Sequence, residues 1–172
     1  VYLDSIQIKY DELAQTEDDS ARLTIQSEIN KLSIKAADFA IPNEFDRLME
    51  EMGGTWINAF TSNDVVCYLN KFPGNQIEKW LEVYSHRFVN PVFRLFQSEL
   101  ETVYEEKNRA MDNMFRELFT TYLSSFFKEH PYGQQTVLGS VDHLKNPSLT
   151  KMQEYYDTFY VANNMALILK II

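Results

Sequence analysis

Two glutamates, Glu99 and Glu106, are the side chains whose spacing most clearly suggests shared chemistry. They lie in a segment with helical periodicity, seven residues apart. At about 100° per residue, this spacing brings them within about 20° of each other on an α-helix, at the border of its apolar stripe. Glu101 and Glu105 fall on roughly the opposite face, where solvated acids belong. The spacing therefore singles out Glu99 and Glu106 from the other acids of this helix.

A carboxylate beside a buried face is costly unless it meets a cation, a metal ion or hydrogen-bond donors. The pair could therefore contribute to a metal site. The alternative is a pair of helix acids in ordinary salt bridges with arginine or lysine, and spacing alone favours that alternative.

Other chemical signals are weak. The three histidines, His86, His130 and His143, are never four residues apart, so no two can bind one metal ion from a single helix face. We expect His130 to cap a helix end, because Pro131 follows it. The single cysteine, Cys67, excludes an internal disulfide and is interpreted as a small core residue.

Composition limits the classes of protein to consider. The chain has 172 residues, which suits one domain or one lobe of a larger protein, and its 45% hydrophobic content is ample for a core. The formal charge of −9 and the lack of basic runs argue against a nucleic-acid or anionic-membrane surface. No apolar stretch approaches the ~18 residues of a membrane span.

Periodicity predicts the elements that must position these residues. The predicted helices cover 1–15, 20–40, a segment from Pro42 to Gly53, 76–89, 95–129 and 148–160. The predicted strands cover 55–61, 65–72 and 164–172. The pattern is typical of an α+β fold with a mostly antiparallel sheet flanked by helices, in which the long helix 95–129 packs across the sheet and a helical extension precedes the rest.

Four segments then resemble one family, in order and spacing over about residues 42–171. They are Gly53-Gly-Thr-Trp-Ile-Asn-Ala-Phe-Thr-Ser, Glu99-Leu-Glu-Thr-Val-Tyr-Glu-Glu106, His130-Pro-Tyr-Gly followed by Gly139-Ser-Val-Asp-His-Leu, and Tyr160-Val-Ala-Asn-Asn-Met-Ala-Leu-Ile-Leu. Together they are similar to segments of the insulinase/pitrilysin zinc metallopeptidases, which include mitochondrial processing peptidase.

The resemblance implies roles for individual residues. Glu106 matches the family's distal zinc ligand, and Glu99 matches an accessory acid that orients the site without touching the metal ion. Asn58, Ala59, Phe60 and Thr61 match the edge strand that accepts a substrate peptide by β-pairing. The family also implies a zinc cofactor, a peptide substrate and a homologous second lobe or subunit.

One family motif is missing. The inverted zinc motif His-x-x-Glu-His supplies two ligands and a general base in this family, and it occurs nowhere in this sequence. Either it was lost, or residues 1–40 are a helical insertion that follows it in a longer protein. We favour the insertion, so that 1–40 are a helical extension and 41–172 part of a metallopeptidase lobe that continues beyond both ends.

Two alternatives stay open at this point. A non-catalytic paralogue of the same fold, acting as a structural or partner subunit, would lack the zinc motif. An acidic helical protein-interaction module would place Glu99 and Glu106 in ordinary salt bridges. The expectation from the resemblance is a zinc-dependent endopeptidase acting on small or unfolded polypeptides, in which this chain alone is inactive.

Overall fold

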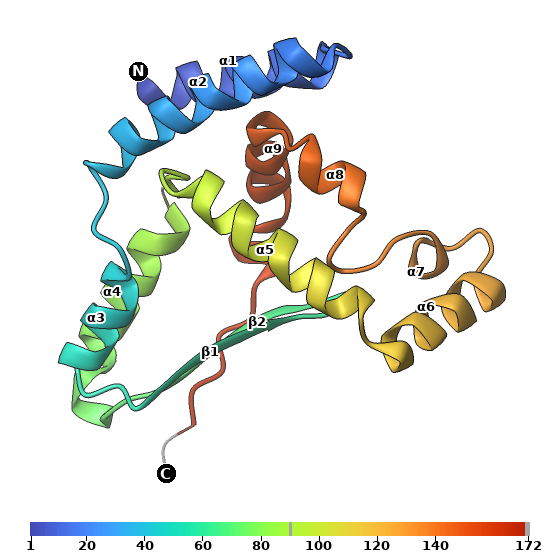
Figure 1. The fold of residues 1–172 in the computed structure, drawn as a ribbon. Helices are drawn as coiled ribbons and strands as arrows, with labels where there is room; N and C mark the ends of the chain where they lie inside the picture. The colour runs from blue at the N-terminus through green and yellow to red at the C-terminus, as the bar shows by residue number, and fades with distance from the viewer. Residues whose placement is uncertain (90, 171–172) are drawn as a thin grey trace.

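The computed structural model describes residues 1–89 and 91–170, and it shows helices arranged around one small antiparallel sheet (Figure 1). The helices are α1 (Tyr2–Gln15), α2 (Asp19–Ala37), α3 (Glu44–Glu51), α4 (Ile77–Val89), α5 (Phe96–Met111), α6 (Met114–Phe126), α7 (Pro131–Gln134), α8 (Val141–Lys145) and α9 (Leu149–Phe159). The strands are β1 (Trp56–Thr61) and β2 (Val66–Lys71), and two 3₁₀ turns are η1 (Gly74–Gln76) and η2 (Ala162–Asn164). The predicted α+β class is confirmed.

The two N-terminal helices pack along each other at one end of the molecule (Figure 1). Asp18 begins α2 by accepting a hydrogen bond from the Ala21 N–H at 2.7 Å, as expected of an N-cap. The two helices supply most of one buried cluster, which α9 completes: Ile6, Tyr10, Leu13, Ile25, Ile29, Ala36 and Leu149. Both predicted N-terminal helices are therefore present, and they are packed rather than solvated on all sides.

A second cluster joins α3, α4 and the hairpin. Met49, Trp80 and Tyr84 are its buried members. Gly53, with φ +83°, turns the chain from α3 into β1, a conformation that favours glycine over residues with a Cβ. The strands pair antiparallel with Asn58 opposite Leu69, so the predicted hairpin is confirmed.

The prediction of one long helix over 95–129 is wrong, because the chain forms α5 and α6 with a break between them. Asn113 adopts an extended backbone, and its side chain accepts hydrogen bonds from the N–H groups of Phe115 and Arg116. This capping starts a new helix where the apolar periodicity continues without interruption. The main packing partners of α5 are α2, α6 and α8, so the expected packing across the sheet is not its principal contact.

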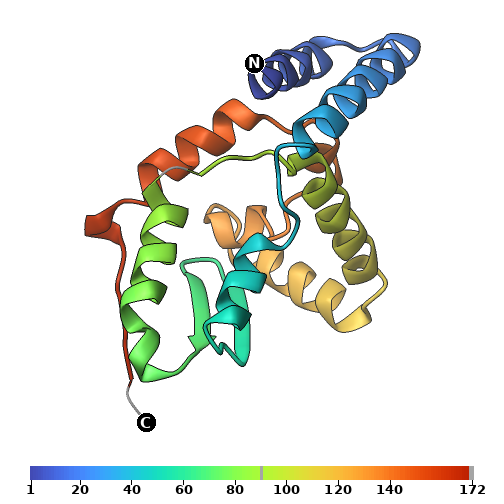
Figure 2. The same ribbon diagram turned by 90° about the vertical axis from the view of Figure 1, so that its left-hand side faces the viewer.

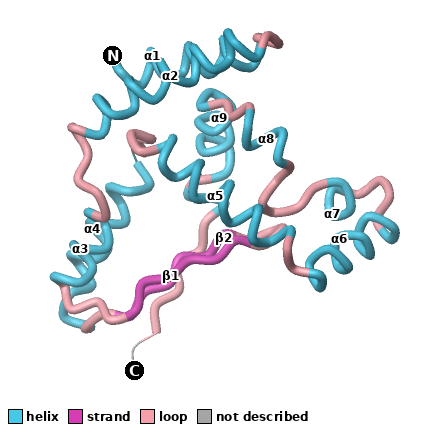
Figure 3. Tube along the Cα trace, viewed as in Figure 1, coloured by secondary structure: helices cyan, strands magenta, loops and turns pink. Residues whose placement is uncertain are grey.

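The prediction of a strand over 164–172 is also wrong for the part that can be assessed. The chain forms η2 and then continues without regular structure over 165–170, while 171–172 lie outside the described residues. The segment has strand-forming composition, but a strand needs a hydrogen-bonded neighbour. In the described part of the chain, the sheet consists of β1 and β2 (Figure 3).

Within residues 1–89 and 91–170, none of the helices combines the length and the apolar character needed to cross a membrane.

Candidate functional site

Glu106 lies on the last two turns of α5, where it lines an open groove between α5 and α6. The groove has a volume of about 430 Å³. Its lining residues are Thr102, Glu106, Arg109, Ala110, Asn113 and Arg116. The bend at Asn113 creates this groove, because it turns α6 away from the axis of α5 (Figure 2). The Glu106 side chain is exposed, so its carboxylate can reach a ligand.

Glu99 lies two turns earlier on α5 and is also exposed. The two acids share a helix, as predicted, but Glu99 is not among the residues that line the groove. Seven residues of α-helix span about 10 Å along the axis, so a groove at the C-terminal end of α5 reaches only the second acid. The expectation that both acids face one groove is therefore wrong.

The expected buried border is also absent, because α5 contains no buried residue among those described. Glu101 and Glu105 are exposed as well, so exposure does not separate the two pairs of acids. The alternative prediction, that Glu99 and Glu106 form ordinary salt bridges, is also not met in residues 1–89 and 91–170. The ion pair on α5 joins Glu105 to Arg109 at 4.0 Å, and neither Glu99 nor Glu106 forms one.

The predicted substrate strand, Asn58 to Thr61, is most of β1, and all four residues are exposed. The Ser62 N–H donates to the Val65 carbonyl at 2.8 Å, in register with the hairpin. Because hydrogen-bonded and non-hydrogen-bonded pairs alternate in an antiparallel ladder, the backbone groups of Ala59 and Thr61 point to the outer edge of β1. That edge has no strand beside it in the described part of the chain.

One outward donor on this edge is already engaged. The Ala59 N–H donates to the side-chain oxygen of Asn58 at 2.8 Å. This local bond satisfies a backbone group that would otherwise wait for water or a peptide. An incoming strand would therefore displace the Asn58 side chain to pair with Ala59.

The His-Pro-Tyr-Gly segment contacts the hairpin, although the two are far apart in sequence. The Tyr132 hydroxyl donates to the Asp64 carboxylate at the hairpin turn, and this hydrogen bond raises the pKa of Tyr132. His130 caps the N-terminus of α7, not the C-terminal end of the preceding helix as predicted, and its ring nitrogen Nδ1 accepts from the Tyr132 N–H at 3.3 Å. At Gly133 a Cβ would come within 2.0 Å of the Phe127 carbonyl oxygen, so only glycine fits this turn.

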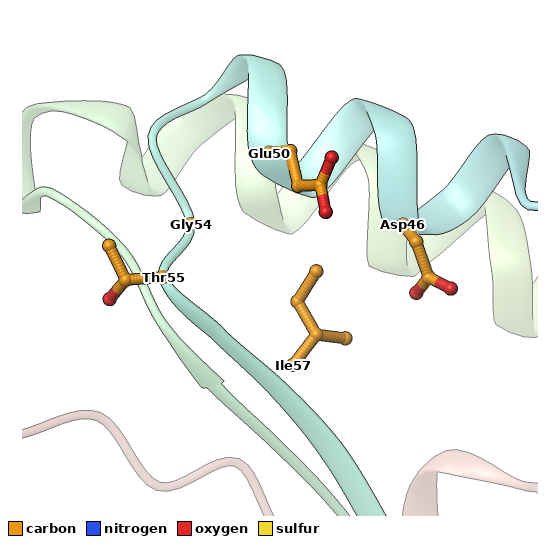
Figure 4. A pocket seen from close by; sticks show the side chains of 5 residues that line it. All are labelled: Asp46, Glu50, Gly54, Thr55 and Ile57. Carbon is orange, nitrogen blue, oxygen red and sulfur yellow. The ribbon is translucent and has the colours of Figure 1, made fainter.

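A second pocket lies where α3 meets the start of β1, with a volume of about 290 Å³ (Figure 4). The carboxylates of Asp46 and Glu50, one turn apart on α3, point toward the Ile57 side chain (Figure 4). Gly54 and Thr55 complete the lining. This pocket is acidic and adjoins the predicted substrate strand, but it contains neither of the predicted site glutamates.

No group of three histidine, cysteine or acidic side chains is arranged to hold a metal ion within residues 1–89 and 91–170. His130 is engaged at the α7 cap, and His143 lies on α8, capped by Ser140. A metal ion bound through Glu106 would need further ligands from outside this set.

Sequence reasoning missed the arginines of the groove, Arg109 and Arg116. They are seven residues apart, as Glu99 and Glu106 are, but the helix break at Asn113 falls between them. The Asp-Asn pair at 112–113 was the available signal, because both residues favour N-caps over helix interiors. Recognising that cap would have predicted the bend and the groove.

Comparison with known proteins gives a consistent result. Residues 29–138 match the sequence profile of the family described as Insulinase (Peptidase family M16). The chain is 23% identical over 128 residues to a protein of Dictyostelium discoideum named mitochondrial-processing peptidase subunit beta, covering 73% of this chain and 27% of that protein. It is 29% identical over 116 residues to a protein of Bacillus subtilis named uncharacterized zinc protease YmfH, covering 66% and 27%.

The chain thus spans about a quarter of the length of these curated relatives. The matched segment includes β1, Glu99, Glu106 and the His-Pro-Tyr-Gly turn, which are among the features that carried the resemblance. The segments that begin at Gly139 and Tyr160 lie outside it. It covers well over half of the 172 residues. The chain belongs to the insulinase family of peptidases.

Proposed function

We propose that this chain supplies one zinc ligand and the peptide-binding strand of a metalloendopeptidase that hydrolyses small or unfolded polypeptides. The observation that carries the proposal is the exposed carboxylate of Glu106. It lines an open groove, within the part of the chain that matches the insulinase family.

The chemistry of Glu106 suits this role. Carboxylate oxygens are among the ordinary protein ligands of zinc, and Glu106 has no ion-pair partner in the described part of the chain. Zinc, when bound in such a site, supplies a Lewis acid and an activated water. Two further ligands and a general base would come from a His-x-x-Glu-His motif in the same longer protein, so Glu106 alone fits part of the site.

Glu99 acts in this proposal as a positioning residue. It lies on the same rigid helix as Glu106 but outside the groove, so any effect on the metal ion passes through neighbouring groups. Changes at such positions typically weaken metal binding by about 10–100-fold, less than the loss of a direct ligand.

The substrate would bind along β1. The outward backbone groups of Ala59 and Thr61 can pair with an extended peptide, and Asn58, Ala59, Phe60 and Thr61 are all exposed to receive it. Main-chain pairing is tolerant of sequence and requires an extended segment. This supports small or unfolded polypeptides as substrates.

The domain division belongs to the same proposal. Residues 1–40 form a helical extension and 41–172 part of a metallopeptidase lobe, with a homologous second lobe or subunit as partner. The Dictyostelium relative is named as a subunit, which agrees with a protein that works with a partner. The alternative, a non-catalytic paralogue acting as a structural or partner subunit, is not the function that the family match favours.

Metal analysis tests the proposal. The 172-residue chain should hold no stoichiometric zinc, because one carboxylate gives a small part of the binding of three protein ligands. The complete protein with its His-x-x-Glu-His motif should hold stoichiometric zinc and cleave an unfolded peptide. Glu106→Gln in the complete protein should lose most of its zinc, and Glu99→Gln should lose less.

Glu82→Gln provides the matched control, since it makes the same change at an exposed acid of α4 that lies outside the groove lining and has no ion pair in the described part of the chain. Tight zinc binding by the 172-residue chain, or full zinc in the Glu106→Gln protein, would show that the ligand assignment is wrong. A complete protein that lacks the motif and binds no zinc would establish the non-catalytic alternative.

A further inference from the structure

The groove beside Glu106 has an unusual charge for this protein. The chain has a formal charge of −9, yet two of the six residues that line the groove are arginines and one is an acid. Arg109 comes from the last turn of α5 and Arg116 from the first turn of α6. The bend at Asn113 brings these two cations to one depression.

Both arginines are available to a ligand. Both are exposed, and Arg109 lies 4.0 Å from Glu105 with each side chain about 75% accessible, so this ion pair is long and contributes little. Arg116 forms no ion pair in the described part of the chain. Its backbone N–H donates to the Asn113 side chain, and its guanidinium forms no hydrogen bond with another described residue.

The charge of the groove increases if Glu106 binds a metal ion. A carboxylate that is shared with a cation no longer offsets the two guanidinium groups, so the surrounding field becomes more positive. Guanidinium groups match the planar geometry of a carboxylate better than any other side chain does. The best-matched ligand is therefore a carboxylate close to the reacting bond of a peptide.

We propose that Arg109 and Arg116 form a subsite for an acidic side chain of the peptide substrate, next to the position of Glu106. The inference rests on the proposed function and makes it more specific, because it names the preferred substrate class as peptides with Asp or Glu near the cleaved bond. The same chemistry would accept a peptide's C-terminal carboxylate, and the probes below separate the two sources.

The test measures binding of blocked peptides to the 172-residue chain, so it needs neither zinc nor cleavage. The probes are Ac-Ala-Thr-Val-Xaa-Val-Thr-Ala-NH₂ with Glu, Gln or Lys as Xaa, labelled for fluorescence anisotropy. The Gln peptide with a free C-terminus is the fourth probe. The Glu peptide should bind about three- to tenfold more tightly than the Gln peptide, and the Lys peptide most weakly.

Variants then locate the effect. Arg109→Glu with Arg116→Glu should reverse the order of the Glu and Lys peptides, whereas Lys79→Glu, an exposed control that reverses one positive charge on α4, should preserve it. Glu106→Gln should strengthen the Glu preference, because it removes the acid of the groove. The Glu preference should weaken in 0.5 M salt, where exposed charges are screened.

Several results would overturn the inference. These are equal binding of the Glu and Lys peptides, an order unchanged by the arginine reversals, the same reversal by Lys79→Glu, or no binding of the Glu peptide at millimolar concentration. Tighter binding of the free-C-terminus Gln peptide than of the Glu peptide would assign the arginines to chain ends instead. Each of these results leaves the zinc assignment of Glu106 intact, and loss of that assignment leaves the binding order measurable.

Discussion

The helical pair α1–α2 and the helical pair α5–α6 both present apolar residues at helical spacing, but only the first pair buries them. In α1 and α2, Leu13 and Ile29 are each 2% exposed. In α6, Leu118 is 65% exposed and Phe115 81% exposed. The same type of pattern therefore gives a core in one region and an open apolar surface in the other.

This contrast separates stability from candidate chemistry along the chain. The buried clusters lie on α1, α2, α3, α4 and α9, whereas α5 and α6 contain no buried residue among those described. Glu106, Arg109 and Arg116 all belong to the unburied pair. We therefore expect substitutions in α1–α2 to change folding, and substitutions in α5–α6 to change binding.

The largest effect should come from a matched pair of leucine substitutions. Leu13→Ala should lower the free energy of unfolding by about 2–5 kcal/mol, because it leaves a cavity in the α1–α2 core. Leu118→Ala removes the same atoms from an exposed site and should change stability by less than about 0.5 kcal/mol. Urea denaturation of the 172-residue chain measures both. Equal losses would contradict the proposed division.

A polar contact in the second cluster should have the next largest effect. The Asn70 side-chain oxygen accepts hydrogen bonds from the Trp80 indole N–H at 3.1 Å and from the Tyr84 hydroxyl. Asn70→Ala leaves both donors without this partner and should cost about 1–3 kcal/mol. Asn58→Ala, in the exposed strand β1, is the control and should cost less. The same urea titration decides between them.

The pH dependence of stability should also report on the packed region. Burial, and then the negative charge of Glu101, raise the pKa of Tyr10 to about 12. The unfolded chain releases this proton near pH 10, so between pH 10 and 12 the folded state holds more protons. The free energy of unfolding should therefore fall as pH rises through this window. The contribution of Tyr10 to stability is fully present below pH 10 and is lost as pH rises toward 12.

Tyr10→Phe should make that fall shallower, because the titrating group is gone. Tyr10→Phe should also lower the free energy of unfolding at pH 7, because it removes the hydrogen bond from the Tyr10 hydroxyl to the Gln97 side chain, which joins α1 to α5. Unfolding titrations at pH 7 and across pH 9.5–12 measure the two effects. An unchanged slope in the Tyr10→Phe chain would show that Tyr10 does not carry the pH dependence.

The packed elements were the ones that sequence could predict. The helix near 20–40 and the hairpin near 55–72 carry local signals: a cap at Asp18, a turn at Gly53, and β-branched and aromatic residues in both strands. The helix break at Asn113 could not be predicted from apolar periodicity, because that periodicity continues through it. The Asn113 side chain caps α6 and so ends the continuous helix there. The strand expected over 164–172 failed because strands depend on neighbours, not on composition alone.

The candidate site was predictable only in part. Spacing and resemblance placed Glu106 on a helix and Asn58–Thr61 on a strand, where the structure also has them. The burial expected beside Glu99 and Glu106 did not follow, because a helical wheel shows which residues share a face but not whether anything covers that face. The groove results from the bend at Asn113. Arg109 and Arg116 therefore lie together only in the folded chain, and their spacing on one continuous helix did not predict it.

The smallest expected effect on stability is that of removing the charge of Glu106 or Glu99 on α5. Glu106→Gln in the 172-residue chain should change the free energy of unfolding by less than about 0.5 kcal/mol, because Glu106 is exposed and has no ion-pair partner in the described part of the chain. Glu99→Gln should behave in the same way. Urea denaturation of the two variants measures this directly. A loss above about 1 kcal/mol at Glu106 would mean that this carboxylate stabilises the fold, and the case for an uncommitted zinc ligand would fail.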